Sequence, residues 1–135
     1  MKIAQRSLLI FLLVCCVLGS VFYAYREEKR IFQEQWEVLQ VNAFLEKINR
    51  DKRCTMENYR ILMEQLHIAG IHDDIYLEIF EKESYYLLTW KEVQKMLAGM
   101  GIDLEPGMLV AVCIEKNTNS YHWKTIYRKI ISRKD

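Results

Sequence analysis

The chain has 135 residues, with 19 basic and 18 acidic side chains and a net charge of +1. This length allows one membrane segment and one domain with a modest core, but not two domains. The near-balanced charge lacks the basic excess of a nucleic-acid-binding protein, so no nucleic-acid partner is expected. A basic cluster near the C-terminus is expected to be solvated, with lipid or partner binding as the alternative; it comprises Arg128, Lys129, Arg133 and Lys134.

An uncharged apolar run covers residues 7–24 near the N-terminus. About 20 apolar residues in a helix cross the hydrocarbon core of a bilayer, and Tyr23 and Tyr25 lie where interfacial aromatic residues are common. We therefore expect residues 1–25 to be a tail and transmembrane anchor and residues 26–135 to be a soluble domain. A cleaved signal peptide is the alternative, with cleavage after Gly19 the tolerable position.

Orientation in the membrane depends on the basic residues that flank the apolar run. Lys2 and Arg6 precede it, while Arg26, Lys29 and Arg30 follow it, so this charge bias is weak. A short tail before a span and a long domain is typical of a signal anchor. The expected localisation is the cell membrane, as a single-pass protein with its domain outside the cell.

The segment 27–50 contains neither Gly nor Pro and is rich in good helix formers, which predicts one continuous helix from about residue 7 to about residue 50. Its apolar residues form two stripes at helical spacing. The first stripe is Phe32, Trp36, Leu39 and Ala43, and the second is Ile31, Val38, Val41, Leu45 and Ile48. A helix that packs on its own domain needs one stripe. The second predicts a face for a partner helix or another copy, unless the domain wraps the helix more fully.

The remaining residues predict alternating short helices and strands. Thr55 is a plausible N-cap for a helix over 56–66 that Gly70 stops, and Thr89 has capping-box spacing with Glu92 before a helix that ends at Gly99 or Gly101. Strands are expected over 74–83, 108–115 and 121–131, with a hairpin loop at 117–120. The expected fold class is therefore α+β: a long N-terminal transmembrane and amphipathic helix followed by a small head with a three-stranded antiparallel sheet and two short helices.

No catalytic motif is present in the sequence, which contains no phosphate-binding glycine loop, nucleophile elbow or paired CxxC. His67 and His72 bracket a loop that continues into Asp73 and Asp74, but a metal site needs three or four convergent ligands. We expect no catalytic residues, no metal, no cofactor and no enzymatic activity. Tyr85, Tyr86 and Trp90 could line a ligand site, although closing the core is the simpler interpretation.

Cys54 and Cys113 are the two cysteines outside the apolar run. In an exported domain they could form a disulfide that closes a loop of about 60 residues, stabilising the fold by about 4 kcal/mol in the chain-entropy model. Two free thiols, with Cys113 buried in a strand, are the alternative.

A hydrophobic helix that runs into an amphipathic one and then into a small α+β head resembles the architecture of type IV pilins and pseudopilins. More locally, residues 54–59 (CTMENY), 66–70 and 74–78 (DIYLE) resemble a stretch in small membrane-anchored proteins of tight-adherence (Tad/Flp-like) pilus systems of Gram-positive bacteria.

This resemblance implies a non-enzymatic pilin-like or accessory subunit, with the lipid bilayer, other subunits of a pilus or envelope complex and further copies of the chain as partners. Gly19 lies inside the apolar run rather than before it, so the prepilin-peptidase site of the family is missing. An accessory role therefore fits better than a major pilin. The alternatives are a membrane-anchored ligand-binding or regulatory domain and a bitopic scaffold.

Overall fold

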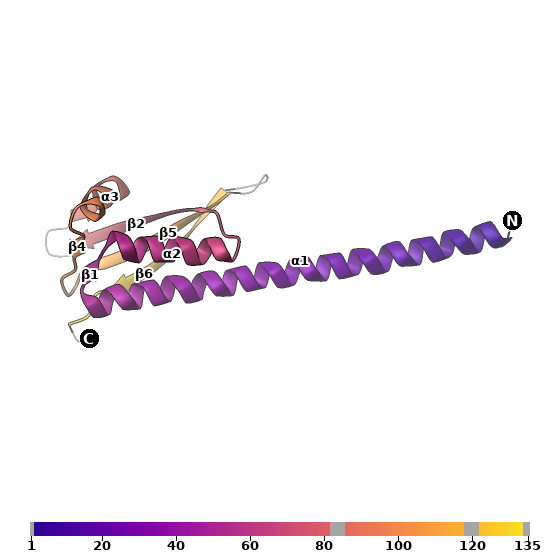
Figure 1. Ribbon diagram of the computed structural model, residues 1–135, viewed down its shortest axis with the longest axis horizontal. Coiled ribbons are helices and arrows are strands. Elements are labelled where there is room, and N and C mark those ends of the chain that lie inside the picture. The colour runs from indigo at the N-terminus through magenta and orange to yellow at the C-terminus, as the bar shows by residue number, and fades with distance from the viewer. Residues whose placement is uncertain (1, 82–85, 118–121, 134–135) are drawn as a thin grey trace. The chain divides into compact units, whose positions relative to one another are not determined.

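The computed structural model describes residues 2–81, 86–117 and 122–133. The chain divides into two compact units, residues 1–35 and residues 36–135. We call the second unit the head. The division falls later than the expected end of the anchor at residue 25, so the first unit also contains the charged turns that follow the apolar run. The elements, in chain order (Figure 1), are α1 (Lys2–Asp51), β1 (Arg53–Cys54), α2 (Met56–Ile68), β2 (Asp74–Glu81), β3 (Tyr86–Leu88), α3 (Trp90–Ala98), β4 (Ile102–Asp103), β5 (Leu109–Asn117) and β6 (His122–Ile130).

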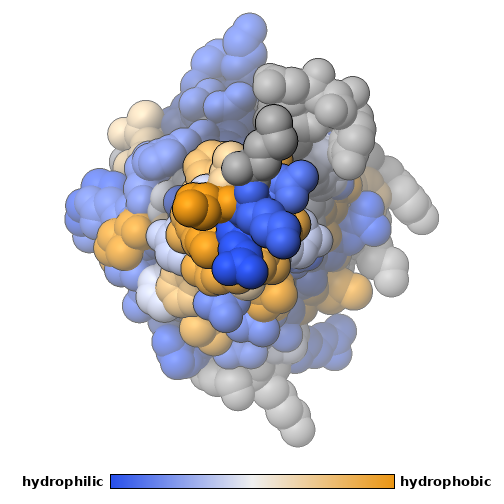
Figure 2. Space-filling model, turned by 90° about the vertical axis from the view of Figure 1, so that its right-hand side faces the viewer, coloured by the Kyte–Doolittle hydropathy of each residue, from blue (hydrophilic) through white to orange (hydrophobic). Residues whose placement is uncertain are grey.

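The first unit consists of the N-terminal part of α1. Helix α1 is continuous, as predicted, and begins earlier than the expected residue 7. Within it lies an 18-residue window that is long and apolar enough to cross a membrane and has no buried residues. Seen from the N-terminal end, apolar side chains surround polar ones at the tip (Figure 2). Residues such as Leu12 and Leu13 are more than half exposed, as a lipid-facing helix requires.

The two ends of α2 are fixed by local hydrogen bonds. Thr55 is the N-cap, and its side chain accepts from the backbone N–H of Asn58 while the Asn58 side chain accepts from the backbone N–H of Thr55, which makes a capping box. At the other end Gly70 adopts a φ of 82°, its N–H donates to the carbonyl of His67, and the N–H of Ile71 donates to the carbonyl of Leu66. This is a Schellman ending, so the predicted N-cap and stop are both confirmed.

Helix α3 begins at the predicted position but without the predicted capping box. Thr89 is the N-cap and makes no side-chain cap hydrogen bond. The Glu92 carboxylate accepts instead from the hydroxyl of Tyr86, at 2.7 Å. Because β3 places Tyr86 beside the first turn of α3, a tertiary contact replaces the local one. The helix ends at Ala98, before Gly99, as expected.

The main sheet has four antiparallel strands in the order β3-β2-β5-β6, so the expectation of three strands was wrong. The additional strand, β3, has three residues, too few for an alternating pattern to be recognised in the sequence. A second, two-stranded sheet pairs β1 with β4. Strand β5 lies centrally, pairing Tyr76 of β2 with Cys113 and Cys113 with Ile126 of β6. Residues 82–83 of the predicted β2 segment and 118–120 of the predicted hairpin loop lie outside the described residues.

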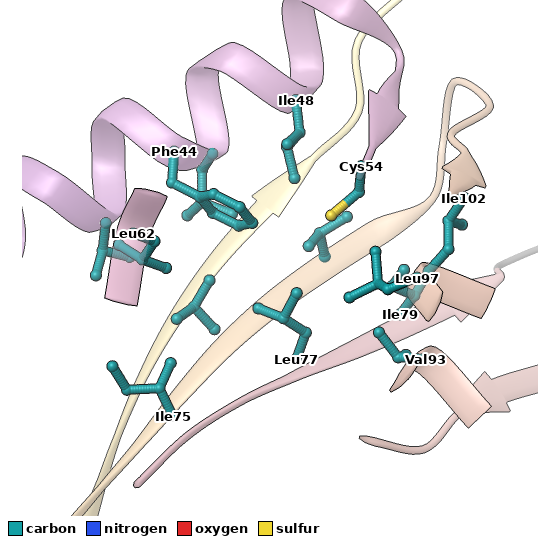
Figure 3. Close-up of a cluster of buried hydrophobic side chains, with 14 of the residues drawn as sticks. Phe44, Ile48, Cys54, Leu62, Ile75, Leu77, Ile79, Val93, Leu97 and Ile102 are labelled. Atoms are coloured by element: carbon teal, nitrogen blue, oxygen red, sulfur yellow. The ribbon is translucent and has the colours of Figure 1, made fainter. Parts of the chain in front are cut away.

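All three helices contribute to a core on one face of this sheet. Side chains from α1, α2 and α3 meet those of β2 in one shared interior, where Phe44, Leu62, Leu77 and Val93 are labelled in Figure 3. Strand β5 contributes Val110, Val112 and Ile114, which are all fully buried. Burying such side chains stabilises a fold by roughly 1.5–3 kcal/mol each. The core therefore fixes the C-terminal part of α1 to the sheet.

The other face of the sheet carries no helix among the described elements. Alternation along the strands places Ala111 and Cys113 on this face, where they are nevertheless buried. Leu87, Ile126 and Ile130 lie on the same face and stay exposed. The head is thus a two-layer α+β structure with one open sheet face.

Candidate functional site

The predicted partner face of the long helix divides into two parts. Val41, Leu45 and Ile48 are at most 3% exposed and belong to the core of the head, so their assignment to a partner surface was wrong. The head wraps the helix more fully than one stripe requires, because α2 and the sheet both pack against it. Trp36 belongs to the same packing, since its indole N–H donates to the carbonyl of Gln65 at 2.7 Å.

The two other residues of that face are accessible. Ile31 is 44% exposed and Val38 is 43% exposed. Leu39, from the first predicted stripe, is 60% exposed. Val38 and Leu39 are therefore apolar side chains on the head's part of α1 that the head itself leaves open.

Cys54 and Cys113 are not brought together. Both are free thiols in the structure. Cys54 belongs to the core cluster, whereas Cys113 alternates with the core residues of β5 and so lies on the opposite face of the sheet. Burial raises the pKa of the Cys54 thiol to about 12. Burial also raises the pKa of Cys113, and the Glu78 carboxylate adds to that rise. Both thiols are therefore poor nucleophiles at neutral pH.

A buried charged network ties α1 to the sheet. Glu37 is 4% exposed, and its carboxylate accepts hydrogen bonds from the Lys116 ammonium and, at 2.7 Å, from the Tyr127 hydroxyl. Lys116 also forms an ion pair with Asp73, at 3.0 Å. Burial lowers the pKa of Lys116, but the two carboxylates outweigh this effect and the net pKa is raised. The network satisfies a charge that would otherwise be costly to bury.

Sequence reasoning missed this network, although one signal for it was available. Glu37 precedes Val41, Phe44 and Ile48 at helical spacing, so it is a charged residue on the face of α1 that enters the core. A carboxylate in such a position needs a buried cation or a hydrogen-bond donor. The identity of its partners depends on β5 and β6, which lie far away in the chain.

A pocket of about 590 Å³ lies on the head between α2, the start of β2 and the first turns of α3. Its lining contains two aromatic pairs, with ring centroids 5.2 Å apart for Tyr59 and Trp90 and 4.9 Å apart for His67 and His72. Of the residues that could line a ligand site, Trp90 does line this pocket, Tyr86 does not, and Tyr85 lies outside the described residues. The proximity of α2 and α3 at this point could not be predicted from sequence spacing.

The charges around this pocket are mainly negative. Asp73, Asp74 and Glu115 line it, and none of the lysines and arginines that the structure describes does. Lys116 does not line the pocket but forms an ion pair with Asp73. The Glu115 carboxylate accepts a hydrogen bond from the Tyr76 hydroxyl at 3.4 Å. Burial and the nearby Asp74 carboxylate raise the pKa of Tyr59, whose hydroxyl donates to the carbonyl of Ile75 at 2.8 Å.

The two histidines and their neighbouring carboxylates do not converge as metal ligands. In the part of the chain that the structure describes, no group of three or more His, Cys, Asp or Glu side chains is placed to hold a metal ion. The rings of His67 and His72 contact each other instead. Besides these two imidazoles, the pocket offers aromatic rings, three carboxylates and the Gln94 amide.

Comparison with known proteins gives no further guide to this arrangement. No protein family, curated protein or solved structure matches the chain.

Proposed function

We propose that this chain is a non-enzymatic single-pass membrane protein, and that it serves as a pilin-like or accessory subunit of an envelope pilus or secretion assembly. One observation carries the proposal: the apolar helix that can span a membrane and the helix that enters the core of the head are the same element, α1. In such a chain the head is coupled to the bilayer by a helix rather than by a linker.

The surface of the head's part of α1 supports an assembly role. Val38 and Leu39 are exposed, whereas Val41, Phe44, Leu45 and Ile48 of the same helix are buried. Exposed apolar side chains close to a membrane anchor provide a contact for a neighbouring helix at low desolvation cost. Further copies of the chain and other subunits of the assembly are the partners that this proposal implies.

A membrane-anchored ligand-binding head is the second candidate function. The pocket beside Tyr59 and Trp90 favours it, because concave sites with convergent polar groups are the usual form of ligand sites. The two functions are compatible, since the pocket and the exposed residues of α1 belong to different elements.

Topology is the first test of the proposal. Cys54 and Cys113 are too buried to report on it, so a cysteine must be introduced at Ile68, which is 73% exposed. We expect a membrane-impermeant maleimide to label Ile68→Cys in intact cells and to leave the parent chain unlabelled. Labelling of Ile68→Cys only after lysis would place the head in the cytoplasm and contradict a surface assembly.

Contact with a neighbouring subunit is the second test. A photo-crosslinking residue at Val38 should trap a discrete adduct in the native cells. The matched control is Lys47, which is exposed and lies on the opposite side of α1 at about 100° per residue. Adducts at Val38 and not at Lys47 are expected; clean monomers at Val38 would count against the assembly role.

A further inference from the structure

The pocket between α2, β2 and α3 borders an incompletely paired strand. In the described part of the chain, strand β3 pairs with β2 from Ile79 to Glu81. Among the described residues, no strand pairs with residues 74–78 of β2 on the side away from β5. The side chains of α2 and α3 lie beside this part of β2 and leave a pocket of about 590 Å³, a volume typical of small-ligand sites.

The pocket is not suited to the addition of a further strand. Tyr59 donates its hydroxyl to the carbonyl of Ile75, so a side chain already occupies a backbone acceptor that a new strand would need. Trp90 packs against the ring of Tyr59, which keeps that ring in place. A compact group that binds through side-chain contacts fits this geometry better than an extended backbone.

We infer that this pocket binds an alkylammonium group, presented by a lysine side chain of a peptide or protein. The faces of Tyr59 and Trp90 supply the aromatic surface on which an organic cation is attracted. Asp74 and Glu115 supply acceptors for its N–H groups. The inference concerns the head alone and does not depend on the assembly role of α1.

The charges of the lining select a cation over other ligands. Asp73 is already paired with Lys116, whereas the described residues place no hydrogen-bond donor or cation on the carboxylate of Asp74. An anionic ligand would be repelled by the carboxylates of Asp74 and Glu115, and a neutral one would leave the Asp74 carboxylate without a partner cation. The Lys124 ammonium lies 5.0 Å from the ring centre of Tyr76, so one aromatic ring that lines this pocket already contacts a cation from within the chain.

Two natural sources could present such a group: a peptide lysine and an ethanolamine lipid headgroup. The headgroup carries a phosphate next to its ammonium, and this phosphate would approach the same carboxylates. We therefore assign the site to a peptide lysine. The two sources are separated by comparing N-acetyl-lysine N-methylamide with phosphoethanolamine. N-acetyl-norleucine N-methylamide is the uncharged control of nearly equal length.

The experiment uses the full chain, isotopically labelled, in dodecyl maltoside micelles. The indole N–H resonance of Trp90 reports on the pocket, while the resonances of Trp36 and Trp123, which do not line it, report on the fold. We expect the lysine compound to shift the Trp90 resonance saturably and the norleucine compound to leave it in place. No saturable shift, or an equal shift with norleucine, overturns the inference; equal binding of phosphoethanolamine overturns the peptide source.

Variants locate the binding to this pocket. Asp74→Asn and Glu115→Gln should each weaken binding of the lysine compound by roughly tenfold, as expected for the loss of one charged contact. Glu78→Gln is the matched control, since Glu78 lies on β2 outside the pocket and its loss should change nothing. Unchanged binding in Asp74→Asn, with Trp36 and Trp123 resonances intact, would show that the lysine compound binds elsewhere.

Discussion

A position in the head can require glycine for two reasons: a positive φ angle, or too little space for a Cβ atom. Three glycines differ in which of these reasons applies. Gly101 has a φ of 91°, and a Cβ there would lie 3.0 Å from the carbonyl oxygen of Cys54. Gly107 has a φ of 96° with open space around it, and Gly99 has a negative φ with only ordinary contacts. A side chain at position 101 would therefore meet both a strained backbone angle and a close contact. A side chain at position 107 would meet the strained angle alone, and one at position 99 would meet neither.

Alanine substitutions should follow this order. We expect Gly101→Ala to lower the free energy of unfolding by about 2 kcal/mol, Gly107→Ala by about 1 kcal/mol and Gly99→Ala by close to zero. Urea denaturation of the full chain in micelles, followed by tryptophan fluorescence, measures the three. Equal losses at Gly101 and Gly107 would show that the pairing of β1 with β4 adjusts without cost.

The Glu37 network should contribute more to the free energy of unfolding than a surface ion pair does. Glu37→Ala leaves Lys116 and Tyr127 without their shared acceptor, and we expect it to lower the free energy of unfolding by about 3 kcal/mol. Glu64→Ala is the control, because Glu64 pairs with Arg60 on the exposed side of α2 and should cost less than about 0.5 kcal/mol. Similar losses in the same denaturation assay would mean that the buried pair gives no net stabilisation.

Alkaline pH should destabilise the head through Cys54. The unfolded thiol releases its proton near its ordinary pKa of 9.0, whereas the folded thiol retains it up to a pKa of about 12. The folded state therefore holds more protons, so this contribution is complete below pH 9 and is lost as pH rises toward 12. Lys116, whose folded pKa is also raised, adds a loss of the same sign above its ordinary value of 10.5.

The measurement is the urea midpoint as a function of pH for the parent and for Cys54→Ala. We expect the parent to lose stability across this alkaline range. In the variant, the slope of the unfolding free energy with pH should be smaller by the equivalent of about one proton. Identical pH dependence in the two chains would show that the thiol of Cys54 ionises in the folded head as it does in the unfolded chain.

At the scale of elements, the starts of α2 and α3 look alike in sequence and differ in structure. Thr55 caps α2 with its side chain, whereas Thr89 makes no such bond at the start of α3. Thr55→Ala should therefore lower the free energy of unfolding by about 1 kcal/mol and Thr89→Ala by only a few tenths. Losses of equal size would contradict the difference between the two caps.

At the scale of the whole molecule, the proposed function requires that the apolar run be kept as an anchor. We expect the protein extracted from membranes to have the full mass of 16.2 kDa, since a cleaved signal would shorten it. Placing arginine at both Leu12 and Leu13 should move most of the protein out of the membrane fraction, at about 3 kcal/mol per charge. Leu39→Arg, outside the run, should leave it there. Retention of the double variant in membranes would contradict the anchor.

The sequence by itself determined the elements that local forces control. The continuous helix follows from a segment without Gly or Pro after residue 19, and the ends of α2 follow from Thr55 and Gly70, because caps and propensities act within a few residues. The α+β class followed from the same local patterns.

Only the tertiary structure decided which apolar residues are inside. Val41, Leu45 and Ile48 carry the same spacing as a partner face, and their burial depends on α2 and the sheet meeting them from distant parts of the chain. Packing between distant parts of the chain also decides three other features: the partners of Glu37, the separate faces of Cys54 and Cys113, and the pocket beside Trp90. Periodicity fixes the face of a helix on which a residue lies, but what covers that face is set by long-range packing.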